Sequence, residues 1–157
     1  VLINASSNQG PTDDYRVKPD ITGNGTSVIS TNSTSDSSTT TMTGTSMASP
    51  NVAGTLLLLQ QHYKNLTNSF MRSATLKGLA CHTADDAGDI GPDPIFGWGL
   101  LNMKKAAETI TNNGLSSWVS EQTLRNEEVF TMTVNSNGSI PDQVSAITPS
   151  AIIVSLK

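Results

Sequence analysis

Ser46 is the residue whose type and setting most directly indicate chemistry. It follows Gly44 and Thr45 and lies within residues 37–63, which contain no aspartate, glutamate, lysine or arginine. A serine at the start of an apolar helix can cap that helix by accepting a backbone N–H. It can also act as a nucleophile, because the N–H groups and the dipole at a helix N-terminus favour the oxyanion formed on an acyl carbon. In the second interpretation Gly44 leaves room for a substrate backbone.

The segment after this serine is predicted to form a helix over residues 46–63. A helix that is polar on one face would carry charges, so this helix is expected to be buried nearly all round. Pro50 is tolerated only near the first turn, which places the helix start close to Ser46. Gly54 costs about 1 kcal/mol relative to alanine in an exposed helix, so it predicts close packing against another element.

Three further elements are predicted before residue 112. A short strand at residues 27–30 precedes a loop at 31–41 that is rich in serine and threonine. A second helix begins near Asn68, and a third covers residues 102–110 with Asn102 as its N-cap. The core face of the second helix is expected to consist of Phe70, Met71, Ala74 and Leu79.

The composition changes after Asn112, where the sequence NNGLSS predicts a domain boundary. We therefore expect two parts, residues 1–112 and 113–157. Strands are predicted at residues 129–134 and 151–156. Two strands cannot close a sheet of their own, so the second part is expected to be only the start of a β-rich domain.

Composition excludes several classes of function. The formal charge of −4 argues against a nucleic-acid binder. The most apolar run, residues 52–59, is less than half a bilayer span, so no membrane-spanning helix is expected. Cys81 is the sole cysteine, which rules out an internal disulfide framework and indicates a small buried residue at a helix end. The low content of charged residues, 14%, favours an exported protein, secreted or extracellular.

Four segments together resemble the subtilisin-like serine proteases, or subtilases. GTSMASPNVAG, which contains Ser46, is similar to the active-site serine motif of this family. The other three segments are SSNQGP at residues 6–11, KPDITGNGTSVIST at 18–31 and FGWGLLNMKKAAE at 96–108. Because the four lie in family order and at family spacing, the resemblance favours the nucleophile over the helix cap.

The resemblance implies a fold and a reaction. The implied fold is α/β: the C-terminal portion of a subtilisin-like parallel-sheet domain with a buried central helix, followed by a partial β extension. The implied reaction is hydrolysis of peptide bonds in protein or peptide substrates, with Ser46 as the acyl-forming nucleophile. Gly44, Thr45 and Ser46 are then the residues next to the substrate, and the backbone N–H of Ser46 is one oxyanion donor.

The base that such a serine needs is expected to lie outside this chain. The family presents its catalytic groups in the order Asp, His, Ser, so the Asp and the His should precede Val1. His62 lies sixteen residues beyond Ser46 on the same predicted helix, roughly 24 Å away at 1.5 Å per residue. His82 matches no family role. We therefore expect that the chain is a fragment, inactive alone, and that its partner is the missing N-terminal part of the catalytic domain.

Two other functions stay open at this point. One is a non-catalytic interaction module that keeps the subtilase scaffold. The other is a hydrolase that combines Ser46 with His82 and Asp85 or Asp86 in a new geometry. If the chain is a fragment, core surface left exposed is expected to favour a dimer or higher oligomer, or pairing with another polypeptide.

No cofactor is assigned with certainty, and calcium is the candidate metal. The resemblance admits calcium because many family members bind it at surface loops, although the aspartate spacing matches no EF-hand. Solvated acidic loops are the competing interpretation. The aspartates concerned are Asp13, Asp14, Asp85, Asp86, Asp89 and Asp93.

Overall fold

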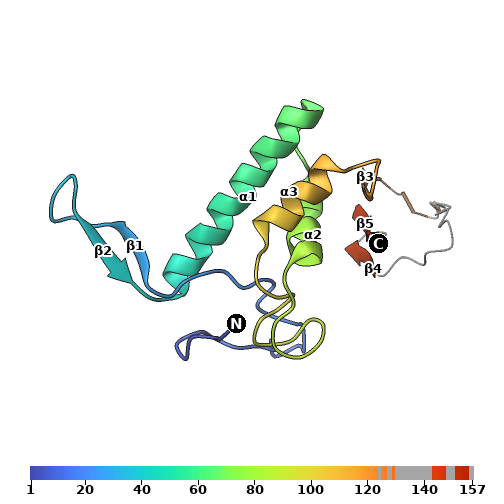
Figure 1. Ribbon diagram of the computed structural model, residues 1–157. Helices are drawn as coiled ribbons and strands as arrows, with labels where there is room; N and C mark the ends of the chain where they lie inside the picture. Colours follow the sequence, from blue (N-terminus) through green and yellow to red (C-terminus); the bar gives the residue numbers. More distant parts are fainter. Residues whose placement is uncertain (124, 127–128, 130–142, 148–150, 156–157) are drawn as a thin grey trace. The chain divides into compact units, whose positions relative to one another are not determined.

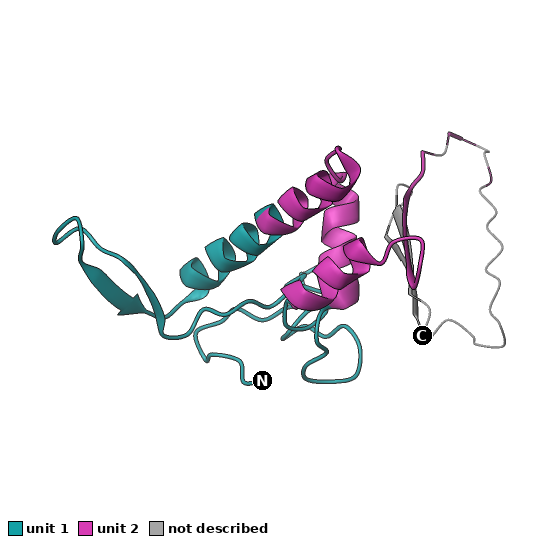
Figure 2. Ribbon diagram, turned by 45° about the horizontal axis from the view of Figure 1, so that its top comes forward, with its two compact units in different colours: residues 1–57, 84–101 teal, residues 58–83, 102–157 magenta. Residues whose placement is uncertain are grey.

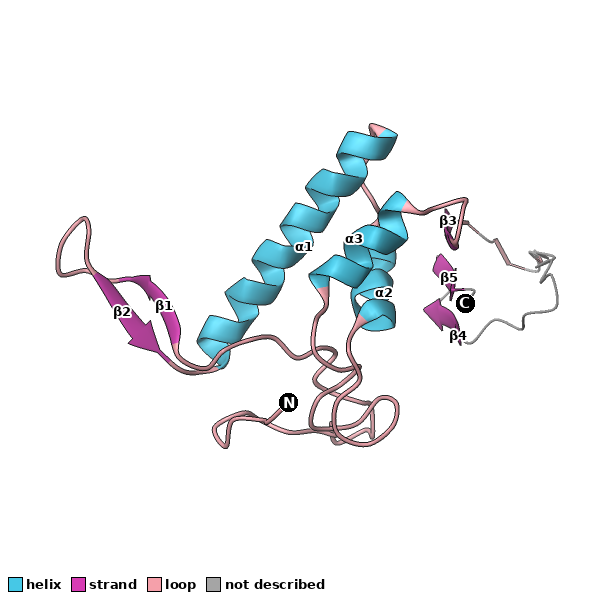
Figure 3. Ribbon diagram, in the orientation of Figure 1, coloured by secondary structure: helices cyan, strands magenta, loops and turns pink. Residues whose placement is uncertain are grey.

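The computed structural model describes residues 1–123, 125–126, 129, 143–147 and 151–155. The described elements are three helices and two small antiparallel sheets (Figures 1 and 3). They group into two compact units (Figure 2). Unit 1 consists of residues 1–57 and 84–101, and unit 2 of residues 58–83 and 102–157.

A β-hairpin follows the KPDIT segment in unit 1. Strands β1 (Val28–Thr31) and β2 (Thr39–Met42) pair antiparallel, from Val28 opposite Met42 to Thr31 opposite Thr39. The strand predicted at 27–30 is therefore confirmed within one residue. The loop predicted over 31–41 is wrong in its second part, because the β-branched threonines that we assigned to it favour a strand.

Backbone hydrogen bonds join three distant segments of unit 1. Leu101 N donates to Thr22 O at 2.9 Å, and Leu100 exchanges two 2.8 Å bonds with Asp85. These contacts place the FGWGLLN segment between the KPDIT segment and the start of the aspartate-containing segment at residues 85–93. Gly99 has φ = 112°, and a Cβ there would lie 2.2 Å from the Asp85 carbonyl oxygen. Only glycine fits this close approach.

Helix α1 (Thr45–Thr67) begins where Pro50 predicted, but its burial differs from the prediction. Of its side chains only Leu59 is fully buried, whereas Leu57 is 70% exposed and Leu58 is 51% exposed. The expectation of a helix buried nearly all round is therefore wrong for the described residues. The parallel sheet that the prediction placed around this helix is not among them.

The close packing predicted at Gly54 is also not found. A Cβ built on Gly54 has no neighbour within 4 Å among the described residues. Gly23 shows the opposite environment, because a Cβ there would lie 2.5 Å from Val52 Cγ2 and 3.2 Å from Ala48 O. Close packing against α1 therefore requires glycine at Gly23, in the KPDITGNG segment, and not at Gly54 in the helix itself.

Unit 2 packs two short helices around the second half of α1. These are α2 (Ser73–Thr83) and α3 (Met103–Thr111). Its core has side chains at most 4% exposed: Leu59, Met71, Leu79, Ala80, Ala106 and Ile110.

The start of α2 corrects one prediction, and α3 confirms another. Asn68 does not cap α2; it adopts φ = 58° in the connection before the helix, and Phe70 is 66% exposed instead of lying in the core. Asparagine is one of the residues that tolerate this left-handed conformation. Asn102 does cap α3, since its side chain accepts a 3.0 Å bond from Lys105 N.

A three-stranded antiparallel sheet completes unit 2. Strand β5 (Ala151–Ser155) lies between β3 (Ser117–Glu121) and β4 (Gln143–Ile147). The strand predicted at 151–156 is confirmed for 151–155, and β3 and β4 were not predicted. The strand predicted at 129–134 lies outside the described residues except for Val129. Unit 2 contains residues from both sides of the predicted boundary at residue 112, and that boundary stays a prediction.

Helix α2 carries the second histidine and the sole cysteine near its end. His82 and Cys81 are each half-buried, so Cys81 is less buried than predicted. Burial lowers the pKa of His82 from its ordinary value of 6.5, because desolvation disfavours the charged imidazolium. No helix in the described part of the chain has the length and apolar character needed to cross a bilayer.

The contrast between the two glycines gives a stability prediction. Gly54→Ala should raise the free energy of unfolding of the 157-residue chain by about 0.5–1 kcal/mol, because alanine is the better helix former and its methyl meets open space. Gly23→Ala should lower it by about 1–3 kcal/mol through overpacking. Urea denaturation of the two variants checks the signs, and destabilisation by Gly54→Ala would show that this face is covered.

The burial of His82 gives a pH prediction. The folded chain binds the imidazole proton less tightly than the unfolded chain, so this residue removes stability as the pH falls through 6.5. An NMR titration, with the resonance assigned by His82→Gln, should place the His82 midpoint below 6.5. A midpoint at or above that value would contradict the burial.

Candidate active site

Ser46 lies in the first turn of α1 with its side chain exposed. The helix begins at Thr45, and Gly44 O accepts bonds from Met47 N at 3.0 Å and from Ala48 N at 3.3 Å. Gly44 therefore precedes the helix, and Ser46 is not its N-cap. The Ser46 hydroxyl makes no hydrogen bond to any residue that the structure describes, which leaves it available at the positive end of the helix.

A backbone contact holds the turn that leads into this helix. Gly44 N donates to Gly25 O at 2.8 Å. A Cβ on Gly25 would lie 2.6 Å from Gly44 O and 2.9 Å from the Ala48 Cβ. The GNG sequence thus lets the KPDITGNG segment lie directly against the start of α1. Our sequence analysis missed this contact, although the two glycines around Asn24 were its signal.

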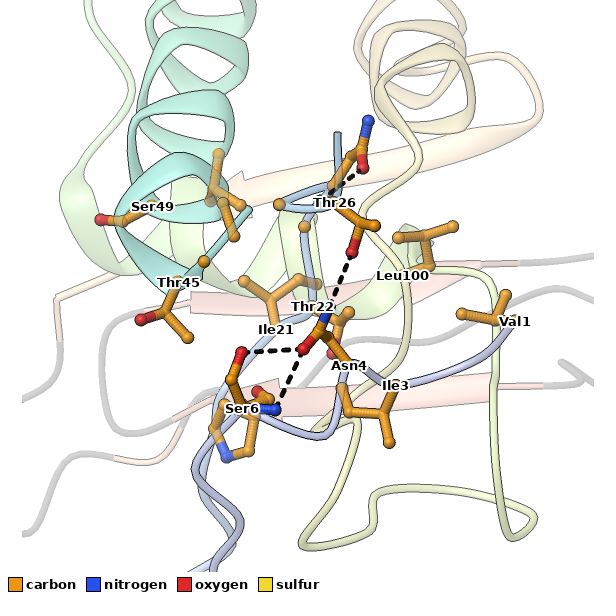
Figure 4. A pocket seen from close by; sticks show the side chains of 18 of the residues that line it. Val1, Ile3, Asn4, Ser6, Ile21, Thr22, Thr26, Thr45, Ser49 and Leu100 are labelled. Atoms are coloured by element: carbon orange, nitrogen blue, oxygen red, sulfur yellow. Dashed lines mark hydrogen bonds between the residues drawn. The ribbon is translucent and has the colours of Figure 1, made fainter. Parts of the chain in front are cut away.

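An open hollow of about 580 Å³ borders the same turn in unit 1. Gly44, Thr45 and Ser49 line it from the start of α1, whereas Ser46 is not among its lining residues. Figure 4 shows Thr45 and Ser49 on α1, with Asn4 contributed by the N-terminal segment. Two of the three residues predicted to lie next to the substrate therefore border one open space.

Hydrogen bonds order the N-terminal wall of this hollow (Figure 4). Asn4 Oδ1 accepts from Ser6 N at 3.0 Å and from Ser6 Oγ at 2.8 Å. Asn4 Nδ2 donates to Thr26 Oγ1 at 3.4 Å. Asn4 thereby ties the chain before the SSNQGP segment to the chain after KPDITGNG.

His62 is not placed to act as the base for Ser46. His62 Nε2 lies 2.9 Å from Thr111 Oγ1, and it is about four helical turns beyond Ser46 along α1. His82 belongs to α2 in unit 2, whereas Ser46 belongs to unit 1. No hydrogen bond joins Ser46 to a histidine or an aspartate in the part of the chain that the structure describes, so the combination with Asp85 or Asp86 finds no support.

The aspartates do not gather into a metal site. Asp14 pairs with Arg16 at 2.8 Å, and the hydrogen bond from Thr12, followed by that from Arg16, lowers the pKa of Asp14. Asp93 is buried, and its Oδ1 accepts from the backbone N–H groups of Ile95 and Phe96. No group of three or more His, Cys, Asp or Glu side chains among residues with described positions is suited to hold a metal ion. Calcium stays a prediction.

Comparison with known proteins identifies relatives of this chain. A sequence profile of the subtilase family matches residues 2–99. The PII-type proteinase of Lacticaseibacillus paracasei is 34% identical in an alignment of 120 residues that covers 66% of this chain and 6% of that protein. The autotransporter lipoprotein NalP of Neisseria meningitidis serogroup B is 44% identical over 63 residues, which are 40% of this chain and 5% of that protein. The chain thus spans only a small part of these relatives.

A solved structure shares the fold. The CspB protease of Clostridium perfringens aligns with a TM-score of 0.61 and 26% identity, over 70% of this chain and 24% of that protein. The mixture of helices with small sheets is accordingly part of a subtilisin-like α/β fold, as the sequence predicted. With the family profile covering more than half of its length, this chain belongs to the subtilase family.

Proposed function

We propose that this chain is the nucleophile-bearing part of an exported subtilisin-like serine endopeptidase. The observation that carries the proposal is the Ser46 hydroxyl, exposed in the first turn of α1 without a hydrogen-bond partner in the described part of the chain. The turn is held by the Gly25–Gly44 contact, and Gly44 and Thr45 border an open hollow. Membership of the subtilase family supports the same reaction.

In the proposed reaction Ser46 Oγ attacks the carbonyl carbon of a peptide bond while a base accepts its proton. The resulting oxyanion accepts a hydrogen bond from the backbone N–H of Ser46, which the positive end of α1 strengthens. Collapse of the tetrahedral intermediate breaks the C–N bond, protonates the leaving amine and leaves an acyl group on Ser46. Water then releases the acid and restores the serine.

The base and the group that orients it come, in this proposal, from residues outside the 157 of this chain. The engagement of His62 with Thr111 supports this view. The exposed leucines Leu57 and Leu58 and the open space at Gly54 support a docking face for the rest of the catalytic domain on α1. In the absence of that part, the same apolar surface would drive association of copies of the chain.

The substrates are proposed to be proteins or peptides, and the location to be outside the cell. The name of the Lacticaseibacillus relative is that of a proteinase, and the name of the Neisseria relative is that of an autotransporter lipoprotein. The low charge content of this chain, 14%, accords with export. Neither nucleic acid nor a membrane is proposed as a partner.

Reconstitution tests the catalytic role of Ser46. The chain alone should show no peptide hydrolysis. Adding a separately expressed N-terminal subtilase segment that carries the Asp and the His should restore hydrolysis of a fluorogenic peptide. Ser46→Ala should then lower turnover on the order of 10⁶-fold, the loss known for subtilisin itself.

Ser37→Ala is the matched control, because Ser37 is also an exposed serine but does not line the hollow beside Gly44 and Thr45. It should leave turnover within about threefold of the wild type. Turnover by the chain alone that depends on Ser46 would overturn the proposal that the base lies elsewhere. Binding of the N-terminal segment without any hydrolysis would favour a non-catalytic interaction module.

The proposed docking face on α1 predicts opposite effects of one substitution. Gly54→Ala, expected to stabilise the chain alone, should weaken its binding to the N-terminal segment, because the face would then be covered and a methyl would intrude. Isothermal titration calorimetry should show an affinity lower by about tenfold, the equivalent of roughly 1.4 kcal/mol. Unchanged affinity would place the docking surface elsewhere.

A further inference from the structure

The N-terminus of helix α2 is capped by a residue from a distant strand. Glu121, the last residue of β3, accepts hydrogen bonds on Oε1 from Arg72 N at 2.7 Å and from Thr75 Oγ1 at 2.5 Å. Because α2 begins at Ser73, Arg72 occupies the N-cap position and Thr75 the third helical position. Thr75 is only 1% exposed, so this contact is shielded from solvent.

The arrangement repeats a capping box with one of its members replaced. In a capping box, a glutamate at the third helical position reaches back to the backbone N–H of the N-cap residue. Here the third position is occupied by Thr75, whose side chain has a hydroxyl group in place of the carboxylate. Its hydroxyl instead donates to Glu121, which supplies the acceptor for the Arg72 N–H. A carboxylate at this place is also favoured by the helix dipole.

The side chain of Arg72 also contacts the end of β3 and the residues that follow it. Its Nε lies 3.5 Å from Glu121 Oε2, and its guanidinium donates to Thr123 Oγ1 at 3.1 Å and to Gln122 O at 3.5 Å. The Arg72 side chain is 49% exposed and that of Glu121 is 22% exposed, so the ion pair itself is screened and the hydrogen bonds carry more weight.

The side chain of Gln60 forms two hydrogen bonds with the backbone of the neighbouring residue, Met71. Gln60 of α1 donates from Nε2 to Met71 O at 2.8 Å and accepts from Met71 N at 3.0 Å. Two successive backbone N–H groups, those of Met71 and Arg72, are therefore held by side chains from α1 and from β3. The connection between α1 and α2 is thus fastened on both sides.

We propose that Glu121 is a latch that makes the β3–β5–β4 sheet an integral part of unit 2. The carboxylate completes the first turn of α2, and Gln60 carries the attachment on to α1. In consequence the sheet does not behave as an independent domain after residue 112. Displacing β3 frees the first turn of α2 and the connection that precedes it. This inference does not depend on the proposed protease activity.

Hydrogen–deuterium exchange on the 157-residue chain tests the latch. In Glu121→Ala, peptides covering residues 71–76 and 117–121 should exchange roughly five- to thirtyfold faster, as expected for loss of a helix cap. Glu121→Gln keeps an acceptor and should give an intermediate increase. Peptides covering β1 and β2 in unit 1 should exchange at the wild-type rate.

Glu108→Ala is the matched control. Glu108 is also in unit 2, and its Oε1 lies 3.8 Å from Lys104 Nζ. Both side chains are exposed, and the Glu108 carboxylate does not cap a helix in the described part of the chain. This variant should leave residues 71–76 unchanged. Unchanged exchange of residues 71–76 in Glu121→Ala, or faster exchange confined to 117–121, would overturn the proposal.

A second variant keeps the test decisive if Glu121→Ala does not fold. Thr75→Val removes the donated hydroxyl while it preserves the shape of the buried side chain. It should accelerate exchange at residues 71–76 and at 117–121 together. Acceleration in α2 alone would show that the strand is not held through this contact.

Discussion

The uncharged surface of α1 is the constraint on which the rest of the structure depends. This helix has no aspartate, glutamate, lysine or arginine from Thr45 to Tyr63, yet the described residues fully bury only Leu59 on it. An apolar helix in water gains stability only from what packs against it. Its first turns are held by the KPDITGNG segment, and its second half by α2 and α3. The remainder faces open space, which is the physical basis for proposing a further partner.

Two kinds of contact hold the ends of this helix. At its start, Gly23 and Gly25 bring a backbone segment so close that a Cβ at either position would overlap its neighbours. In its second half, Gln60 forms hydrogen bonds with both backbone groups of Met71. The backbone N–H of the next residue, Arg72, donates to Glu121. The exposed serine is thus presented by a helix that is anchored through backbone polar groups and not through a large apolar core.

The sequence predicted local features more accurately than environments. The start of α1, the Asn102 cap and the last strand follow from Pro50, from capping chemistry and from an apolar run, all of which act within a few residues. Burial of Leu57 and packing at Gly54 depend on segments far away in the sequence. Both were predicted on the assumption that a parallel sheet surrounds α1, and the described residues do not include such a sheet. The hairpin strand at 39–42 was missed because polar threonines were assigned to a loop. The role of Glu121 was beyond reach, since its partner lies 49 residues earlier.

The central claim is that Ser46 becomes a nucleophile only when groups from another segment join it. The most direct measurement is intact-mass and peptide mapping after treatment with a fluorophosphonate, which modifies activated serines covalently. The account predicts that the chain alone gains no adduct, and that the chain bound to the N-terminal segment gains one adduct, on Ser46. An adduct on Ser46 in the chain alone, or an adduct on another serine in the complex, would contradict it.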